Sequence, residues 1–133
     1  MENKTKFEII TPSKTVIQED VEMVVLPGSE GYFGVLHLHA PTLSSLNQGI
    51  ISLYEKNKIT KKIIIDGGIA DVQPEGCVVL SEKAETTDDL DKKKIEEQLK
   101  VSNEKLSASN SDSEKDSHSK EISWLKFILE NIE

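Results

Sequence analysis

The sequence predicts a mainly β sandwich in the N-terminal part of the chain and an α-helical hairpin in the C-terminal part. From residue 6 to about residue 82, short stretches of alternating or β-branched apolar residues are separated by turn-forming residues, a spacing typical of an all-β sandwich or barrel. After Glu85 the apolar residues recur every three or four positions, which is the period of an amphipathic helix. We therefore expect a sandwich domain over residues 1–85 and a two-helix tail over residues 86–133.

The expected strands lie where apolar side chains alternate or β-branched residues cluster, around Phe7, Ile9 and Val16 and over residues 21–25, 51–54, 61–66 and 77–80. Turns are expected between them at clusters of Pro, Gly, Asn and Asp, namely Thr11–Ser13, Pro27–Gly28, Asn47–Gly49, Asp66–Gly68 and Pro74–Gly76. Asp66–Gly68 and Pro74–Gly76 are interpreted as hairpin turns between adjacent strands. Because no helix-length amphipathic segment interrupts this series, an alternating βαβ sheet is not expected.

The first expected helix has a thin apolar stripe. Ile95, Leu99 and Leu106 fall at helical spacing, and Thr86 with Asp89 is the expected N-terminal cap. Such a helix buries little by itself, so its stability must come from packing on the sandwich or on another protein. A tail held by weak packing can take two positions, which is the physical basis of a switch.

The second expected helix has the stronger pattern, because apolar residues recur every three or four positions over residues 122–132. Ser113 and Asp116 are the expected residues at its start. Serine is dense over residues 107–113, and serine competes for helix backbone hydrogen bonds, so a flexible elbow is expected there.

Composition excludes several classes of partner. The net charge of −8 disfavours nucleic acid and direct contact with an anionic membrane surface. All sixteen basic residues are lysine, so no planar, bidentate arginine site for phosphate or carboxylate is available. Cys77 is the only cysteine, which excludes an intrachain disulfide and a thiolate metal cluster. The apolar runs are far shorter than the roughly 20 residues of a membrane span, so any membrane location is expected through a partner.

The stretch Gly28–Gly34 has glycines at intervals of three and is the first candidate site. A phosphate-binding loop needs a Gly-Lys-Ser/Thr sequence and a following helix, whereas Val35 and Leu36 predict a strand. The favoured interpretation is a tight loop with glycine at positive φ. An exposed loop on a rigid sandwich can also serve as a docking surface.

His37 and His39 would share a face if they lay on a strand, but the sequence places no third metal ligand beside them. Asp66 and Asp71 are further candidates only if the fold brings them close to the histidines. We therefore expect no metal, and we expect a hydrogen-bonded loop histidine before Ala40–Pro41. Cys77 is expected in a strand core, and no residue set with a catalytic pattern is present, so no catalytic residue and no cofactor are expected.

Three lysines, Lys92–Lys94, open the first helix. The favoured interpretation is a solvated face, where pairs with Glu96 and Glu97 contribute only about 0.2–0.5 kcal/mol each. The alternative is contact with an acidic partner or with nucleotide phosphates.

Several short motifs in order along the chain resemble one protein family. They are Gly28–Gly31, His39–Pro41 with Leu43, Gly67–Gly68 after its apolar run, Val72 with Pro74, and Leu90–Asp91. In their order and spacing they are similar to the epsilon subunit of F-type ATP synthases. That resemblance covers nearly the whole chain, and the family architecture is also a sandwich followed by two helices.

The resemblance implies a non-catalytic subunit of the rotating central stalk. It implies that the sandwich binds the gamma subunit, that its lower loops rest on the c-ring, and that proton flow is coupled to ATP synthesis through this link. The implied contacts with the c-ring or gamma are Gly28, Ser29, Glu30, Gly31, Tyr32 and His39. It further implies a peripheral protein on the cytoplasmic side of the bacterial inner membrane, a location that the absence of a presequence also favours.

The resemblance implies that the tail can reach the alpha and beta subunits and regulate ATP hydrolysis. Some bacterial relatives bind ATP through an Ile/Leu-Asp-x-x-Arg-Ala motif, and here Asp91 and Lys94 stand in it, with lysine replacing arginine and Ile95 replacing alanine. Lysine cannot reproduce a bidentate phosphate contact, so ATP binding is not expected. In the final helix only Lys120 and Lys126 offer basic contacts to an acidic partner, and acidic residues stand beside them. Because like charges across an interface weaken docking, strong inhibition of ATP hydrolysis is not expected either.

Two other functions fit the sequence less well. A free-standing β-sandwich that binds a ligand such as a carbohydrate usually presents exposed aromatic side chains, whereas aromatics are 5% of this chain. An enzyme would need convergent polar groups that the sequence does not offer.

Overall fold

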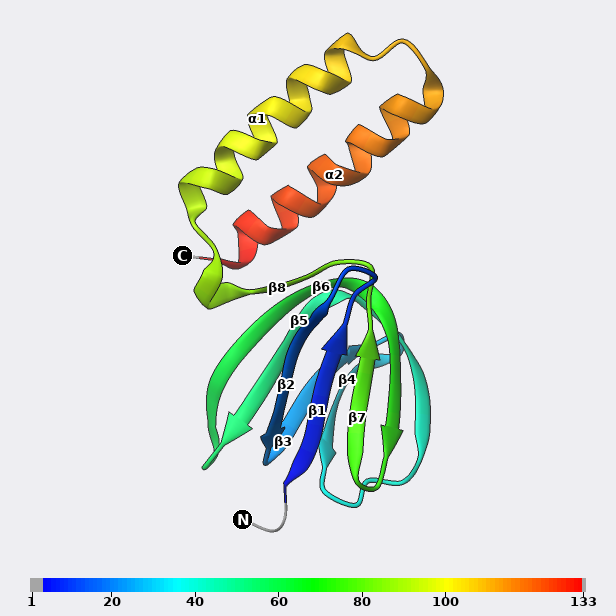
Figure 1. Ribbon diagram of the computed structural model, residues 1–133, viewed down its shortest axis with the longest axis vertical. Helices are drawn as coiled ribbons and strands as arrows, with labels where there is room; N and C mark the ends of the chain where they lie inside the picture. Colours follow the sequence, from blue (N-terminus) through cyan, green and yellow to red (C-terminus); the bar gives the residue numbers. More distant parts are fainter. Residues whose placement is uncertain (1–3, 133) are drawn as a thin grey trace. The chain divides into compact units, whose positions relative to one another are not determined.

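The computed structural model describes residues 4–132, and the chain consists of two compact units, Met1–Asp88 and Asp89–Glu133. The first unit is built from strands and the second from two helices, which confirms the predicted fold class (Figure 1). The strands are β1 (Thr5–Ile10), β2 (Thr15–Val21), β3 (Met23–Gly28), β4 (Gly31–Leu36), β5 (Thr42–Glu55), β6 (Lys58–Gln73), β7 (Gly76–Leu80) and β8 (Ala84–Thr86).

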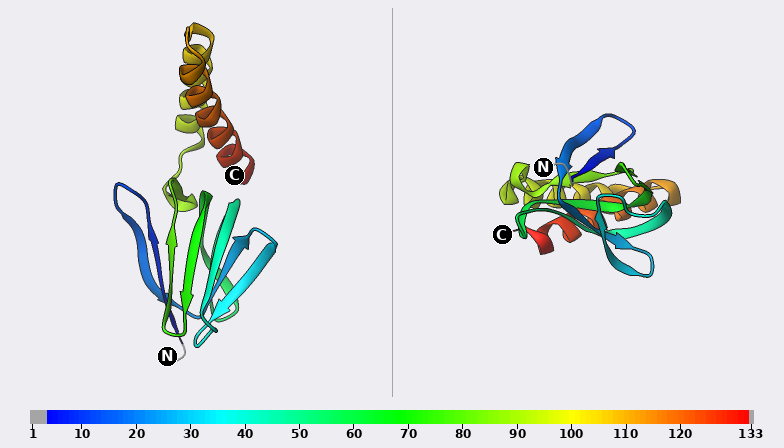
Figure 2. Two further views of the ribbon diagram at one scale, coloured as in Figure 1. Left: turned by 90° about the vertical axis from the view of Figure 1, so that its right-hand side faces the viewer. Right: turned by 90° about the horizontal axis from the view of Figure 1, so that it is seen from below.

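The strands form one eight-stranded sheet in the order β2-β1-β7-β6-β5-β3-β4, and β8 pairs with β6 outside this path. Neighbours are antiparallel except β1 and β7, which run parallel with Phe7 opposite Cys77. The sheet becomes a sandwich because the long strands β5 and β6 pass through both layers. The first part of β6 pairs with β8, and its last part pairs with β7, which in turn pairs with β1. The β1–β2 hairpin therefore belongs to one layer, and the β3–β4 hairpin, which pairs with β5, belongs to the other (Figure 2).

The bend of β6 lies at Gly67 and Gly68, whose φ angles are +78° and +144°. A Cβ atom on Gly68 would lie 2.2 Å from the carbonyl oxygen of Leu80, so only glycine fits against β7 here. The prediction of a hairpin turn at Asp66–Gly68 was therefore wrong, because these glycines bend a continuous strand. The expected turn at Asn47–Gly49 was also wrong, since it lies inside the paired strand β5.

The core of the sandwich lies between the two layers and comes from alternate positions of nearly every strand. Its buried members are Phe7, Ile9, Val21, Val24, Leu26, Val35, Leu46, Ile51, Leu53, Ile63, Ile65, Ala70, Val72, Cys77 and Val79. One open side of the sandwich carries an ion pair between Glu19 on β2 and Lys61 on β6, with 2.7 Å between oxygen and nitrogen. Both side chains are about one-third exposed, so this pair contributes little to stability compared with the core.

The second unit is a helical hairpin of α1 (Lys92–Ala108) and α2 (Asp112–Asn131), preceded by a single 3₁₀ turn, η1 (Thr87–Asp89). The N-cap of α1 is Asp91, whose carboxylate accepts a hydrogen bond from the amide of Lys93 at 3.0 Å. The expected cap at Thr86 and Asp89 was wrong, because Thr86 pairs with Ile63 at the end of β8. The buried residues of α1 are Ile95 and Ser102, in keeping with its thin stripe.

Helix α2 begins two residues before the position that the sequence predicts. Its N-cap is Ser111, whose hydroxyl accepts a hydrogen bond from the amide of Glu114 at 3.2 Å, rather than Ser113 or Asp116. Residues 109–111 form the short connection between the helices, so only the middle of the serine-rich segment 107–113 is non-helical and its two ends belong to α1 and α2. The apolar residues toward the C-terminal end of α2 are buried, among them Ile122, Leu125 and Ile128.

Candidate functional site

The glycine-rich segment after Pro27 forms the tight turn between β3 and β4. Gly31 has a φ of +129°, and a Cβ atom on Gly28 would lie 2.8 Å from the carbonyl oxygen of Gly31. Ser29 and Glu30 form the exposed tip. Strand β4 follows directly, so no helix N-terminus faces this loop and the phosphate-loop interpretation is excluded.

Tyr32 is 61% exposed, yet its hydroxyl has a structural role. The amide of Ile50 on β5 donates a hydrogen bond to it at 3.3 Å, where the pairing of β3 with β5 is irregular. A Cβ atom on Gly49 would lie 2.8 Å from this hydroxyl and 2.6 Å from the Cβ atom of Pro27. The hydroxyl of Tyr32 is therefore held against β5 while most of its side chain remains exposed.

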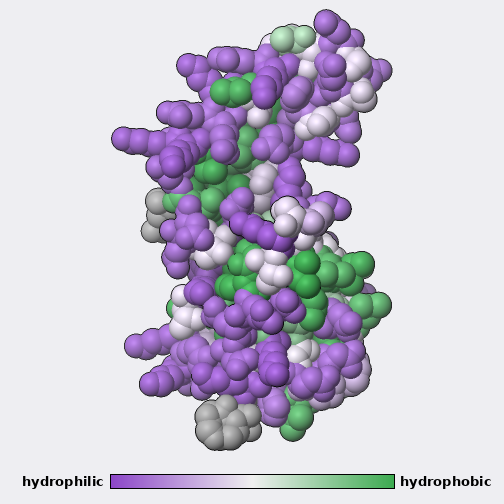
Figure 3. All heavy atoms as spheres, viewed as in Figure 1, coloured by the Kyte–Doolittle hydropathy of each residue, from purple (hydrophilic) through white to green (hydrophobic). Residues whose placement is uncertain are grey.

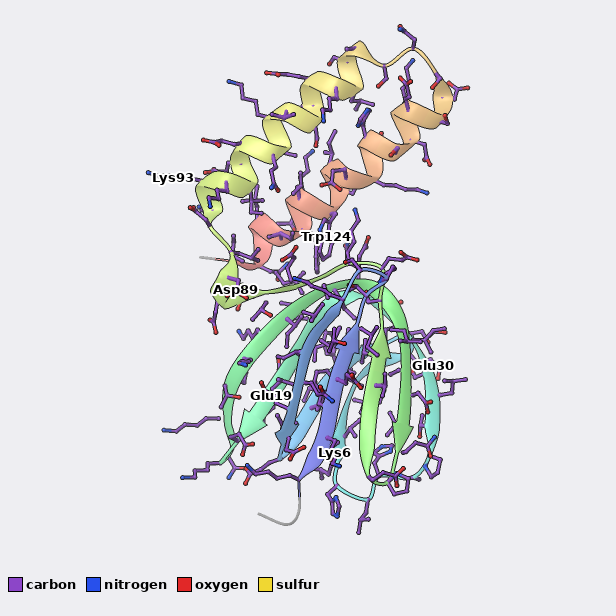
Figure 4. All side chains as sticks on the ribbon, in the orientation of Figure 1. Lys6, Glu19, Glu30, Asp89, Lys93 and Trp124 are labelled. Carbon is purple, nitrogen blue, oxygen red and sulfur yellow. The ribbon has the colours of Figure 1, made fainter. Side chains whose placement is uncertain are left out.

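The candidate residues form two groups rather than one. Gly28, Ser29, Glu30, Gly31 and Tyr32 gather at the start of β4, whereas His39 follows its end. A six-residue strand separates the groups by about 17 Å at the usual rise per residue. Figure 4 shows Glu30 along the side of the sandwich, away from the lower loop that joins β4 to β5.

The loop between β4 and β5 contains both histidines. Nδ1 of His39 lies 2.7 Å from the carbonyl oxygen of Ala40 and donates to it, which confirms the expected hydrogen-bonded loop histidine. Nδ1 of His37 is buried and has no hydrogen-bond partner within the described part of the chain. Among residues 4–132, no group of three His, Cys, Asp or Glu side chains is placed to hold a metal ion.

A patch of apolar side chains lies on the outer face of the β1–β7–β6–β5 layer. Ile69 pairs with Leu80 across β6 and β7, and Leu80 pairs with Ile10 across β7 and β1. On β5, Leu43 lies two residues from Ser45, the partner of Ile69. Leu43, Ile69 and Leu80 are 76%, 47% and 50% exposed. Figure 3 shows hydrophobic residues gathered on the side of the sandwich where β7 and the adjacent part of β6 lie. We call Ile10, Leu43, Ile69 and Leu80 the outer-face patch.

Sequence reasoning missed this patch, because an alternating strand does not reveal which of its faces is covered. Ile69 and Leu80 were the residues from which the patch could have been predicted. In each strand apolar residues occupy both alternating sets, as expected for a sheet covered on both faces.

Beside the outer-face patch, the same layer has an acidic hollow of about 510 Å³. Its lining includes the carboxylates of Glu8, Asp20, Asp71 and Glu75, with Lys6 as the accompanying cation. A surface with this charge repels nucleotide phosphates, so it does not provide an ATP site.

A family model described as the ATP synthase delta/epsilon chain β-sandwich domain matches residues 4–87. The ATP synthase epsilon chain of Rhodospirillum rubrum is 36% identical over 115 residues, which cover 86% of each chain.

This chain belongs to the ATP synthase epsilon chain family.

The match extends through the helical tail. The ATP synthase epsilon chain of Parvibaculum lavamentivorans is 31% identical over 132 residues, covering 99% of this chain and all of the relative. A chain in the Euglena gracilis mitochondrial ATP synthase has the same fold, with a TM-score of 0.66 at 21% identity, covering 92% of this chain and 78% of that one. The epsilon chain is an accessory subunit of ATP synthase and not its catalytic subunit.

The epsilon chain is part of a membrane-bound complex. None of its helices, within residues 4–132, is both long and apolar enough to cross a membrane.

In this epsilon chain the two weak nucleotide candidates, Asp91 and Lys94, lie at the start of α1. The carboxylate of Asp91 caps the helix, and Lys92–Lys94 are exposed in its first turn. The contacts of Asp91 are those of a structural residue, so the geometry adds nothing in favour of a nucleotide site.

Proposed function

We propose that this epsilon chain is the non-catalytic rotor subunit that links gamma to the c-ring and thereby couples proton translocation to ATP synthesis. The observation that carries the proposal is the outer-face patch, which leaves apolar side chains of the sandwich open to a partner. An exposed apolar patch of this kind is typical of a protein interface. The related Euglena chain comes from an assembly of OSCP, F1 and c-ring, which supports the same setting for this chain.

Gamma is the proposed occupant of the outer-face patch. Leu43, Ile69 and Leu80 lie on the adjacent strands β5, β6 and β7 and are exposed on the same face, so one partner surface can contact all three. The other proposed contacts, Gly28–Tyr32 and His39, belong to separate loops and face gamma or the c-ring from either end of β4. A free-standing ligand-binding module is not favoured, because the relatives are subunits of an assembly.

The test of the gamma contact is Leu80→Asp. Leu80 is half exposed in the isolated chain, so the substitution should leave the fold intact, which circular dichroism checks. Placing a carboxylate in an apolar interface should abolish recovery of gamma with the tagged chain from detergent-solubilised membranes. Ile59→Asp is the matched control, since Ile59 is 45% exposed and lies outside the patch. Recovery of gamma with Leu80→Asp at the wild-type level would refute this contact.

The tail is proposed to regulate ATP hydrolysis weakly, through the alpha and beta subunits. Helix α2 carries more acidic than basic residues, and Lys120 already pairs with Asp116 one turn earlier, with 3.2 Å between nitrogen and oxygen. Few basic side chains are thus free to meet an acidic partner. We also propose that the tail binds no ATP, for the reasons given for Asp91 and Lys94.

The proposed location is the cytoplasmic side of a bacterial inner membrane, with the chain held there through the complex. The relatives from Rhodospirillum rubrum and Parvibaculum lavamentivorans are bacterial proteins, which supports this setting. Co-purification of gamma, alpha, beta and c subunits with the tagged chain from the membrane fraction tests both location and partners. A chain recovered alone from the soluble fraction would overturn them.

A further inference from the structure

The charge of the sandwich is unevenly distributed, and its positive part is the hairpin that joins β5 to β6. Residues 55–62 contain four lysines and one glutamate, in a chain whose net charge is −8. Lys56, Lys58 and Lys62 are exposed, and within residues 4–132 none of the three forms an ion pair. The net charge of the whole chain therefore does not describe this surface.

The backbone at the end of this hairpin is held in place. Lys56 and Asn57 have φ angles of +53° and +65°, as in the two-residue turn that matches the twist of paired strands. The carboxylate of Glu22 accepts a hydrogen bond from the amide of Lys56, and the amide of Glu22 donates to the carbonyl of Tyr54 at 3.1 Å. These bonds tie the hairpin to the connection between β2 and β3. A rigid surface of this kind loses little conformational freedom when it docks.

The glutamate of the hairpin has a partner outside it. Glu55 pairs with Lys4 on the chain before β1, with 3.1 Å between oxygen and nitrogen. Its charge is thus directed toward a lysine other than the three exposed ones. The exposed lysines keep a positive excess at the end of the hairpin.

An irregularity in the pairing brings an apolar side chain beside the lysines. Ile59 and Lys61 lie opposite consecutive residues of β5, so Thr60 is an extra, bulged residue. In a regular strand Ile59 and Lys62, three residues apart, would face opposite sides, whereas the bulge places them on the same side. Ile59 is 45% exposed. We call Lys56, Lys58, Ile59 and Lys62 the basic tip.

The composition of the basic tip indicates a layer of anionic lipid headgroups as its partner. Surfaces that lie at a membrane interface combine an apolar side chain, which enters the headgroup boundary, with lysines whose stems lie along it. A lysine ammonium is a point charge that needs no fixed geometry, so it suits mobile lipid phosphates. The hairpin ends at the lower end of the sandwich, where β1 begins (Figure 1). At physiological salt a charge acts over about 8 Å, so acidic groups elsewhere on the chain oppose this contact little.

We propose that the basic tip contacts anionic lipid headgroups directly. The epsilon chain belongs to a membrane-bound complex, and the tip gives it a contact of its own with the membrane surface. This inference goes beyond the proposed function, because it requires neither gamma nor the c-ring. Each lysine close to an anionic membrane strengthens binding roughly fivefold, so three lysines together contribute roughly a hundredfold.

The experiment measures binding of the full chain to lipid vesicles by flotation. Vesicles of phosphatidylcholine with phosphatidylglycerol present anionic headgroups, and vesicles of phosphatidylcholine alone do not. We expect the wild type to bind the anionic vesicles and to be released at about 1 M salt, where charges act over only about 3 Å. The triple variant Lys56→Gln, Lys58→Gln, Lys62→Gln should bind at least about tenfold more weakly. Ile59→Ser should also weaken binding, because the apolar contact is lost.

The matched control is the triple variant Lys92→Gln, Lys93→Gln, Lys94→Gln, which removes the same charge from exposed lysines of α1. It should bind the vesicles like the wild type, and circular dichroism checks that every variant is folded. Equal weakening by the two triple variants, or equal binding of the wild type to both kinds of vesicle, would overturn the inference.

An acidic protein surface is the other possible occupant of the basic tip. If the hairpin variant lost a co-purifying protein while its binding to anionic vesicles was unchanged, the tip would be assigned to that protein and the lipid contact would be refuted. The vesicles contain no protein, so failure of the chain to recover gamma would be a separate result that bears on the proposed function alone.

Discussion

Cys77 is a thiol that the fold keeps protonated. It lies in β7 with its side chain in the core, and burial, with a smaller effect from the carboxylate of Asp71, raises its pKa from 9.0 to about 12. A thiol with this pKa is neither a nucleophile nor a metal ligand near neutral pH. Its presence in the core agrees with the expectation from the apolar run that follows it.

The first prediction is that Cys77 in the native chain resists alkylation by iodoacetamide at pH 8, whereas the urea-unfolded chain reacts readily. Because the thiol stays protonated when folded, its contribution to stability is complete below pH 9 and is lost as the pH rises from about 9 to about 12. The measurement is the labelling rate by mass spectrometry, with Cys77→Ala as the blank. Equal rates in native and unfolded chains would contradict the burial of this thiol.

At the scale of the element, the start of α1 combines one favourable and one unfavourable feature. Asp91 caps the helix, but Lys92–Lys94 place positive charge at the positive end of the helix dipole. The first turn of α1 has no acidic residue to offset this charge. The cap therefore matters more here than at a helix that begins with acidic residues.

A second prediction follows for this helix. Asp91→Ala should lower the stability of the helical hairpin by about 1 kcal/mol, because the amide of Lys93 loses its acceptor. Asp91→Asn, which keeps an acceptor oxygen, should be close to the wild type. Hydrogen exchange of the α1 amides measures the effect. If Asp91→Asn were as damaging as Asp91→Ala, the carboxylate charge rather than the cap would be the important feature.

At the scale of the whole molecule, the chain consists of a sandwich and a separate helical hairpin. The sandwich has its own core, and β8 completes its sheet by pairing with β6 up to Thr86. A chain that stops after Asp88 keeps every strand.

We expect the chain that stops after Asp88 to fold cooperatively and to retain the binding of gamma. Because few basic residues of α2 are free for an acidic partner, its removal should leave ATP hydrolysis by the reconstituted enzyme nearly unchanged. The measurement is the hydrolysis rate with the full and the shortened chain at equal occupancy. Marked activation on shortening would show that the tail inhibits after all.

The sequence by itself determined the fold class, because the change in apolar period from strand to helix is a local property of the chain. It also predicted the buried thiol of Cys77 and a tight turn close to Gly28, although Pro27 and Gly28 themselves belong to β3 and the turn lies one step further on. The family resemblance was likewise readable from short motifs in order.

Tertiary structure alone decided where long-range neighbours meet. Gly67 and Gly68 read as a turn, but they bend β6 because the carbonyl of Leu80 approaches them from another strand. Likewise, the exposed Ile69 and Leu80 form a patch only because β6 and β7 pair in one register. A single sequence shows the period of each strand but not its neighbours, and the neighbours decide which faces are buried and which remain open to a partner.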